Sequence, residues 1–342
     1  MPGNAAETHN SSLQCPSNNK KPPLANTATR RHTNPTQPHP RGRLPVKGLL
    51  LQTRIPVNTA YAIGVAFAYA LVSIFVRMAY DGGSNVLTVI TARALFVLVA
   101  LWSYLAWSGA KWRLPANERN ISLALGVLLA LSNFLLNQAI ARLPVSNALL
   151  IFYTYPVLLS IVSWMTGKDK PTLRVAAALI LSLIGLALTL QAKGGPLDPL
   201  GLAYAISAAT SWGGLMYLSG RMLGGRKSQT HTLHMIMSAT GIFVLACIIT
   251  GDVVFPATAS GWIGFAGAPL AYFVAIVGTM TAISVLGAVR TGFFMNFEAV
   301  GVIFFAALIL EQYMNPLQLL GAALVIVSMF VFNASPRPAS KN

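Results

Sequence analysis

Charged residues are scarce in this chain, since only 9% of its 342 residues are Asp, Glu, Lys or Arg. A soluble domain of this length would carry about 25%. Acidic residues are the scarcest, with 8 Asp and Glu against 24 Lys and Arg. Hydrophobic residues make up 55% of the chain, and its mean hydropathy is +0.62. This composition excludes an ordinary soluble globular protein and indicates a protein embedded in a lipid bilayer.

Cysteine and histidine are too few for a disulfide framework or a metal centre. Of the two cysteines, Cys15 lies in the N-terminal tail and Cys247 in an apolar segment, so we expect no disulfide. His231 and His234 lie three apart at the start of a helix, with no carboxylate or cysteine nearby in the sequence to complete a metal site. Residues 220–228 read GxxxxGRKS, which is one residue too long for a phosphate-binding loop and follows no strand. We therefore expect neither a metal nor a cofactor.

Residues 1–56 form a tail that is rich in Pro, Asn and Thr and carries eight basic residues against one acid, Glu7. Such a composition cannot bury a core, and it predicts a disordered basic cytoplasmic tail. No aromatic platform accompanies the positive charge, so we expect no nucleic-acid partner. A transit peptide is a weaker alternative because prolines interrupt the tail. An over-extended gene start is another, so whether residues 1–45 belong to the mature protein stays open.

Apolar runs fill the rest of the chain. A helix needs about 20 apolar residues to span a bilayer. By this measure the sequence predicts ten transmembrane helices and an all-α polytopic membrane fold. The predicted crossings are 57–78, 86–107, 120–140, 145–166, 172–191, 200–220, 232–250, 263–287, 291–310 and 316–333. Pro269 near the start of the eighth crossing is expected to shorten or kink it.

Short motifs recur in the same order in both halves of the chain, at separations of 143, 144 and 145 residues. The pairs are AYAI at 60–63 and 203–206, RM at 77–78 and 221–222, and AALI at 177–180 with AALV at 322–325. They predict two five-helix repeats, residues 57–191 and 200–333, followed by a cytoplasmic C-tail at 334–342. Because five crossings are an odd number, the second repeat must be inverted relative to the first, as in many secondary transporters.

The distribution of Lys and Arg predicts the orientation in the membrane. With the N-terminus inside, only Arg77, Arg142 and Lys193 fall outside, and Arg93 lies within a helix. All other basic residues are cytoplasmic, as the positive-inside rule requires. We therefore expect both termini in the cytoplasm and a multi-pass protein of the plasma (inner) membrane.

Local patterns between residues 57 and 333 resemble the drug/metabolite transporter superfamily, EamA type. They are TARALF at 91–96, NQAI at 137–140, VSNA at 145–148, YPV at 155–157 and LE at 310–311. The chain departs from the family pattern at 168–169, which reads Lys-Asp in place of Gly-Glu, and at Ala299, where proline is common. The resemblance implies a ten-helix transporter and favours export.

Two ionisable residues lie deep in predicted crossings, Arg93 in the second and Glu298 in the ninth. An ionisable side chain in a bilayer is costly, which makes each a candidate for binding or coupling. Arg93 could instead tie helix carbonyls together. A low-dielectric environment disfavours the charged form of Glu298, so this carboxyl is also the candidate for proton coupling.

Neutral polar and aromatic residues at similar depths complete a candidate substrate-binding pocket: Asn133, Asn137, Tyr153, Tyr155, Trp212 and Asn296. Asn133 and Asn137, four residues apart, share one helix face. The alternative is that the amides join helices and the aromatics fill space.

The function that these features favour is a secondary transporter, an exporter of small polar metabolites such as amino acids, working by alternating access between the repeats. An integral membrane enzyme acting on a lipid-soluble substrate is the alternative, which the lack of membrane-embedded histidine disfavours. A passive channel would need polar rings along a continuous pore, whereas the scattered polar residues at mid-depth fit a closed binding site better. The sequence leaves the substrate, the direction, the coupling ion and the oligomeric state open, a homodimer included.

Overall fold

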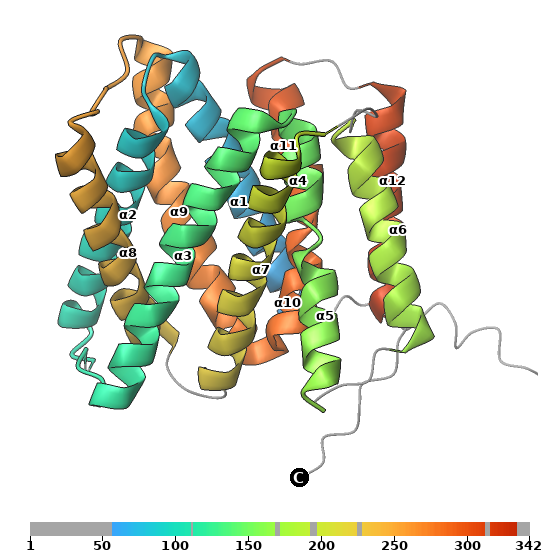
Figure 1. Ribbon diagram of the computed structural model, residues 1–342, viewed down its shortest axis with the longest axis horizontal. Helices are drawn as coiled ribbons and strands as arrows, with labels where there is room; N and C mark the ends of the chain where they lie inside the picture. Colours follow the sequence, from blue (N-terminus) through green and yellow to red (C-terminus); the bar gives the residue numbers. More distant parts are fainter. Residues whose placement is uncertain are drawn as a thin grey trace, which may run out of the picture. The chain divides into compact units, whose positions relative to one another are not determined.

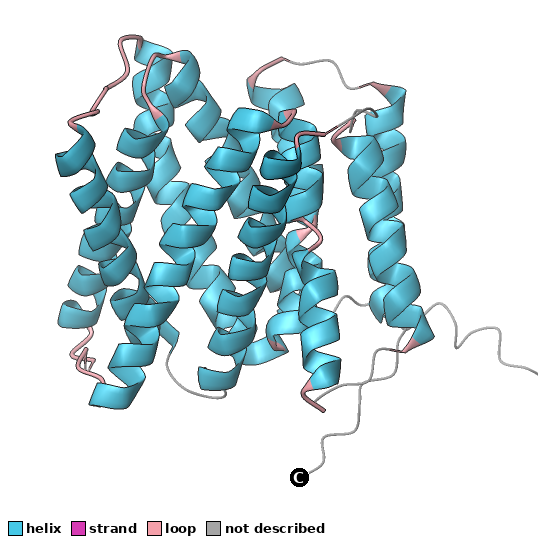
Figure 2. Cartoon of the chain, in the orientation of Figure 1, coloured by secondary structure: helices cyan, strands magenta, loops and turns pink. Residues whose placement is uncertain are grey.

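The computed structural model describes residues 57–110, 112–167, 172–191, 197–223, 228–311 and 315–333. The predicted tails at 1–56 and 334–342 lie outside these ranges. Every regular element in the described part is an α-helix (Figure 2). The helices are α1 (Val57–Asp81), α2 (Val86–Trp107), α3 (Ala116–Arg142), α4 (Val145–Phe152), α5 (Tyr155–Met165), α6 (Leu173–Thr189), α7 (Pro199–Met222), α8 (Ser228–Thr250), α9 (Ala259–Leu286), α10 (Ala288–Met295), α11 (Phe297–Ile309) and α12 (Pro316–Asn333).

These helices account for the ten predicted crossings. In the described chain, eight segments are long and apolar enough to span a membrane, with α4 and α5 counted together, as are α10 and α11. The apolar helix α6 is shorter, and α7 is long but richer in Gly and Ser. The all-α fold with ten membrane helices is confirmed. The eighth crossing, predicted at 263–287, is the uninterrupted α9, which runs through Pro269.

The two halves repeat one another in inverted orientation. Each helix of the first half begins 142 or 143 residues before its counterpart in the second. Helices α1 and α7 are counterparts and run in opposite directions (Figure 1). The packing has the same symmetry. Helix α1 packs on α9, and its counterpart α7 packs on α3, the counterpart of α9. Helices α2 and α6 each pack on their own counterparts, α8 and α12. The predicted pair of inverted five-helix repeats is therefore confirmed.

The fourth and ninth crossings differ from the prediction because each is broken near its middle. The first break separates α4 from α5, where Pro156 lacks the N–H that would bond to the carbonyl of Phe152. The second break separates α10 from α11 at Asn296, with no proline, since Ala299 occupies the position corresponding to Pro156. The ninth crossing also begins earlier than predicted, at Ala288, after Gly287 with φ +84°.

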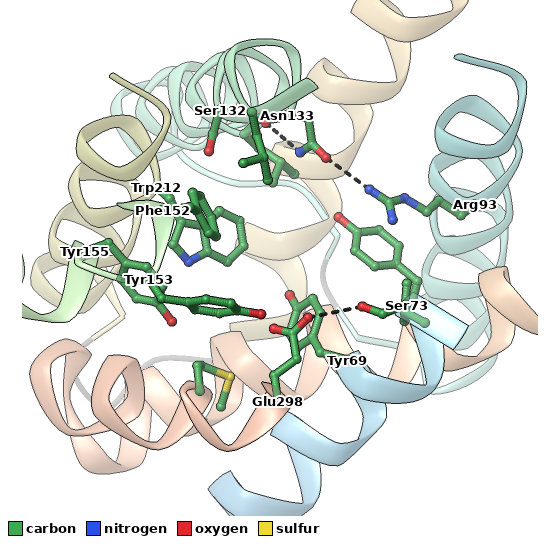
Figure 3. Close-up of a pocket in the computed structure, with 15 residues that line it drawn as sticks. Tyr69, Ser73, Arg93, Ser132, Asn133, Phe152, Tyr153, Tyr155, Trp212 and Glu298 are labelled. Atoms are coloured by element: carbon green, nitrogen blue, oxygen red, sulfur yellow. Dashed lines mark hydrogen bonds between the residues drawn. The ribbon is translucent and has the colours of Figure 1, made fainter. Parts of the chain in front are cut away.

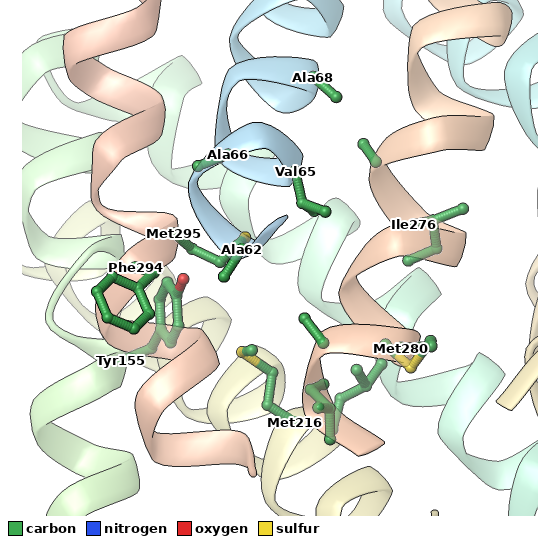
Figure 4. Close-up of a cluster of buried hydrophobic side chains, with 14 of the residues drawn as sticks. Ala62, Val65, Ala66, Ala68, Tyr155, Met216, Ile276, Met280, Phe294 and Met295 are labelled. Atoms are coloured by element: carbon green, nitrogen blue, oxygen red, sulfur yellow. The ribbon is translucent and has the colours of Figure 1, made fainter. Parts of the chain in front are cut away.

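The core lies where α1 and α9 cross, and small side chains on α1 allow the close approach (Figure 4). Ala62 and Ala66 are fully buried there. A methyl group added at Gly264 of α9 would lie 2.7 Å from the backbone nitrogen of Ala79 on α1, so this position of the crossing requires glycine. Small residues at such crossings are typical of membrane helices, because association there depends on packing and not on the exclusion of water. This crossing supports one wall of the central cavity.

Candidate functional site

A central cavity of about 160 Å³ lies between the two halves (Figure 3). Helices of both repeats and both helix breaks contribute to its wall. Its lining consists of Tyr69, Val72, Ser73, Arg93, Leu129, Ser132, Asn133, Leu136, Phe152, Tyr153, Tyr155, Trp212, Tyr272, Met295 and Glu298. Of the eight residues that the sequence marked as candidates, six therefore meet in one cavity: Arg93, Asn133, Tyr153, Tyr155, Trp212 and Glu298.

Glu298 extends into the cavity from the first turn of α11, directly after the second helix break. The hydroxyl of Ser73 on α1 donates a hydrogen bond to Oε1 of Glu298, with an O–O distance of 3.3 Å. The hydroxyl of Tyr153, at the first helix break, points toward the same carboxyl (Figure 3). The carboxyl of Glu298 thus lies between a residue of α1 and a residue of the first helix break (Figure 3).

Arg93 lines another part of the wall and has partners of its own. Its Nη2 donates to Oδ1 of Asn133 at 3.0 Å, and its guanidinium lies 4.5 Å from the ring centre of Tyr272. A cation over an aromatic face in a desolvated site gains about 2 kcal/mol. No ion pair joins Arg93 to Glu298 within the described part of the chain, so the two ionisable side chains line the same cavity without an ion pair between them.

An aromatic cluster forms the wall beside the first break. The rings of Phe152 and Tyr155 lie 5.6 Å apart, and each lies within 6.4 Å of Trp212 on α7. The hydroxyl of Tyr155 donates to the carbonyl of Gly292 on α10 at 3.4 Å. This bond connects the first broken crossing to the second, which carries Glu298 in the cavity wall.

Two sequence candidates lie elsewhere. Asn137 on α3 donates through Nδ2 to the carbonyl of Asn133 and lines a separate, lateral cavity. Asn296 is 1% exposed and donates through Nδ2 to the hydroxyl of Ser182 on α6 at 3.0 Å. The Asn137 amide bonds to the backbone of its own helix, and the Asn296 amide links two helices. Such structural roles were the alternative to substrate binding that the sequence left open.

The cavity also contains polar residues that the sequence did not single out, namely Tyr69, Ser73, Ser132 and Tyr272. Tyr69 and Ser73 lie four residues apart on one face of α1, and this spacing is the signal that could have found them. Tyr272 packs edge-on against Tyr69, with ring centres 6.4 Å apart. Neutral polar residues of this kind do not stand out in an apolar segment until the inward face of the helix is known.

His231 has a carboxylate neighbour from another helix, Glu118 of α3. Its Nε2 lies 3.8 Å from Oε2 of Glu118, and its Nδ1 lies 3.0 Å from the hydroxyl of Ser122. Among the described residues, however, no group of three or more His, Cys, Asp or Glu could hold a metal ion.

The geometry defines a multi-pass membrane protein with an internal two-fold repeat around a small polar cavity. The model of the EamA-like transporter family matches residues 59–191 and 199–334, one match for each half. The chain belongs to this family and is a membrane transporter, as the sequence patterns predicted. A search of curated proteins finds no match.

One solved structure, described only as a crystal structure of a protein, is similar to this chain with a TM-score of 0.68 and 16% sequence identity. The similarity covers 80% of this chain and 96% of the other. At this identity the likeness supports the fold and does not bear on the substrate.

Proposed function

We propose that this transporter is a secondary carrier that exports small polar, zwitterionic metabolites such as amino acids across the plasma (inner) membrane. The observation that carries the proposal is that Arg93 and Glu298 line one cavity without pairing with each other. A substrate carboxylate would bind at Arg93 through charge-assisted hydrogen bonds, and a substrate amine would bind at Glu298. The aromatic cluster of Phe152, Tyr155 and Trp212 would contact the remainder of the substrate.

Alternating access is supported by the symmetry of the fold. Each repeat contributes one broken crossing to the cavity, and inverted repeats allow one half to adopt the conformation that the other half holds. Broken helices at the centre of a transporter also leave backbone groups free to contact a substrate or a coupling ion. In this proposal the cavity opens to one face at a time, and proton binding at Glu298 drives the cycle.

The orientation in the membrane is part of the proposal and rests on the excess of Lys and Arg on one side. Cysteines placed singly at Asn10 and Ser340 should resist an impermeant thiol reagent in intact cells. Cysteines at Asp198 and Asp252 should react with it. Labelling at both termini in sealed cells would overturn the orientation.

Counterflow in proteoliposomes tests the function. Metabolomic comparison of medium and cytosol from overexpressing and deletion cells first identifies the compound to use. A carrier preloaded with unlabelled compound takes up the labelled compound transiently against its gradient, whereas a channel does not and an enzyme alters the compound chemically. Glu298→Gln should reduce counterflow or its pH dependence, while Glu311→Gln, at an exposed position outside the cavity, serves as the matched control.

A further inference from the structure

A second cavity of about 420 Å³ lies between α2, α3 and α8, outside the central site. Its volume lies within the range of about 300–1,000 Å³ that is typical of ligand pockets. We call it the lateral crevice, and it is lined by Val86, Leu87, Ile90, Val127, Ala130, Leu131, Asn133, Phe134, Asn137, Ile242, Phe243 and Ala246. The three helices lie together at one side of the helix bundle (Figure 1).

The chemistry of the lateral crevice suits an apolar occupant. All but two of its lining residues are apolar. The two amides direct their N–H groups into the helix backbone, since Nδ2 of Asn133 donates to the carbonyl of Leu129 and Nδ2 of Asn137 to that of Asn133. A polar ligand entering here would lose its hydration without gaining equivalent hydrogen bonds, which costs free energy.

The rim of the lateral crevice is continuous with the outer surface of the membrane helices. Phe134, Val127 and Leu131 on α3 are 57%, 48% and 42% exposed, and Ile242 on α8 is 38% exposed. In a bilayer these side chains face lipid, so the crevice is in contact with acyl chains and not with water. A hydrocarbon chain can enter without breaking any hydrogen bond of the protein.

The second repeat shows what a filled version of this crevice looks like. The position that corresponds to Ala130 is Phe273 on α9, 143 residues later. Phe273 packs against a buried cluster formed by Leu101, Leu105 and Leu233 from α2 and α8. Where the second half places an aromatic ring, the first half has a methyl group. The space in the first half is therefore a difference between the repeats and does not follow from the shared fold.

We propose that the lateral crevice binds an acyl chain of a membrane lipid, bordered by the α3 face that carries Ala130 and Asn133. Asn133 lines both the crevice and the central cavity, where its Oδ1 accepts from Arg93. A bound chain packs against the residue that holds the guanidinium in place. This lipid site does not depend on which substrate the central cavity carries, because Asn133 is the one described residue that lines both and the crevice is otherwise apolar apart from Asn137.

Photolabelling tests the proposal directly. The full-length protein is reconstituted in nanodiscs that contain a trace of phosphatidylcholine with a diazirine in the middle of one acyl chain, and labelled residues are mapped by mass spectrometry. We expect several-fold heavier labelling at Leu87, Leu131 and Ile242 than at Leu308 and Leu320, which are at least as exposed on other helices. Phosphatidylglycerol with the same chain should give the same pattern, because the crevice contacts the chain and not the headgroup.

Two variants fill the crevice, and a third is the matched control. Ala130→Phe copies the second repeat, and Ala246→Phe fills the half-buried rim on α8, so that either one suffices if the other fails to fold. Each should reduce crevice labelling several-fold, while Leu245→Phe, at the exposed neighbouring position outside the crevice, should leave it unchanged.

Three results would overturn the lipid site. The first is uniform labelling of the crevice and the reference residues in the native protein. The second is heavy labelling that survives both filling variants. The third is an unlabelled crevice together with oxidative dimerisation of Phe134→Cys, which would show that a second copy of the chain covers this face. None of these results depends on a transport assay, so the proposed function could stand or fall separately.

Discussion

The two broken crossings occupy corresponding places in the two repeats but differ in chemistry. Tyr155 and Pro156 in the first correspond to Glu298 and Ala299 in the second, 143 residues later. The first break has an evident local cause in Pro156, whereas the second persists without a proline. The shared fold therefore maintains the break even where the local sequence does not require it, and the positions around it have diverged into an aromatic wall and an ionisable wall.

The residues at the breaks themselves show the same divergence. Tyr153 faces the cavity, where its hydroxyl points toward Glu298 (Figure 3). Its counterpart Asn296 is not among the residues that line the cavity; it is buried, and its Nδ2 donates to the hydroxyl of Ser182. Corresponding positions in an inverted repeat thus need not have corresponding surroundings: in this chain Tyr153 lines the central cavity, whereas Asn296 joins α11 to α6.

The largest effect on the free energy of unfolding is expected from proline substitutions in and after the second break. Ala306→Pro, in the interior of α11, removes a helix hydrogen bond and should lower the free energy of unfolding by about 3 kcal/mol. Ala299→Pro should cost roughly 1 kcal/mol or less, because proline is tolerated in the first turn and the N–H of Ala299 makes only a 3.4 Å bond to Asn296. Reversible denaturant unfolding in detergent measures both. Equal costs at the two positions would show that the break at Asn296 is not a fixed feature of the second repeat.

A smaller effect should separate the roles of Asn296 and Tyr153. Asn296→Ala removes the donor to the buried hydroxyl of Ser182 and should lower the free energy of unfolding by about 1–3 kcal/mol. Tyr153→Phe keeps the ring and removes only the hydroxyl that faces Glu298, so it should alter transport at nearly unchanged stability. Unfolding and counterflow measured on both variants check this. The opposite pattern, with Asn296→Ala impairing transport at full stability, would place Asn296 in the transport site.

The smallest effect is expected at Ser73, on the unbroken helix α1. Ser73→Ala removes one hydrogen bond to Glu298, which is worth about 0.5–1.5 kcal/mol and corresponds to an apparent affinity weakened by roughly two- to tenfold. Ser73→Thr retains a hydroxyl and should restore most of the loss. Substrate titration of the exchange rate measures both variants. If alanine and threonine behaved alike, the hydroxyl would have no part in holding the carboxyl.

Hydropathy and charge in the sequence were sufficient to predict the membrane helices, because a bilayer requires each crossing to be a predominantly apolar helix of about 20 residues. Arg93 and Glu298 stood out for the same reason, as ionisable residues in apolar segments. The duplicated motifs led to the inverted repeats, which the helix starts confirm. These features depend on the solvent around the chain and can be recognised without knowing how the helices pack.

The remaining features depend on packing. Tyr272 faces the cavity because of how α9 is rotated about its axis, and no local pattern in the sequence reports that rotation. The sequence could not reveal the break at Asn296, since no proline marks it. The lateral crevice exists because Ala130 stands where the second repeat has Phe273, which becomes meaningful only when the two halves are aligned in space.

The central claim is that proton binding at Glu298 drives transport. Proton-driven transport by Glu298→Gln tests it most directly. The substitution keeps the size of the side chain and much of its hydrogen bonding with Ser73 while removing ionisation. Proteoliposomes carrying the native protein, Glu298→Gln or the exposed control Glu311→Gln are given an imposed pH gradient, and substrate accumulation is followed. The native protein and Glu311→Gln should accumulate substrate, whereas Glu298→Gln should not respond to the gradient. Accumulation by Glu298→Gln equal to that of the native protein across the whole pH range would contradict the assignment and make Glu298 a structural residue.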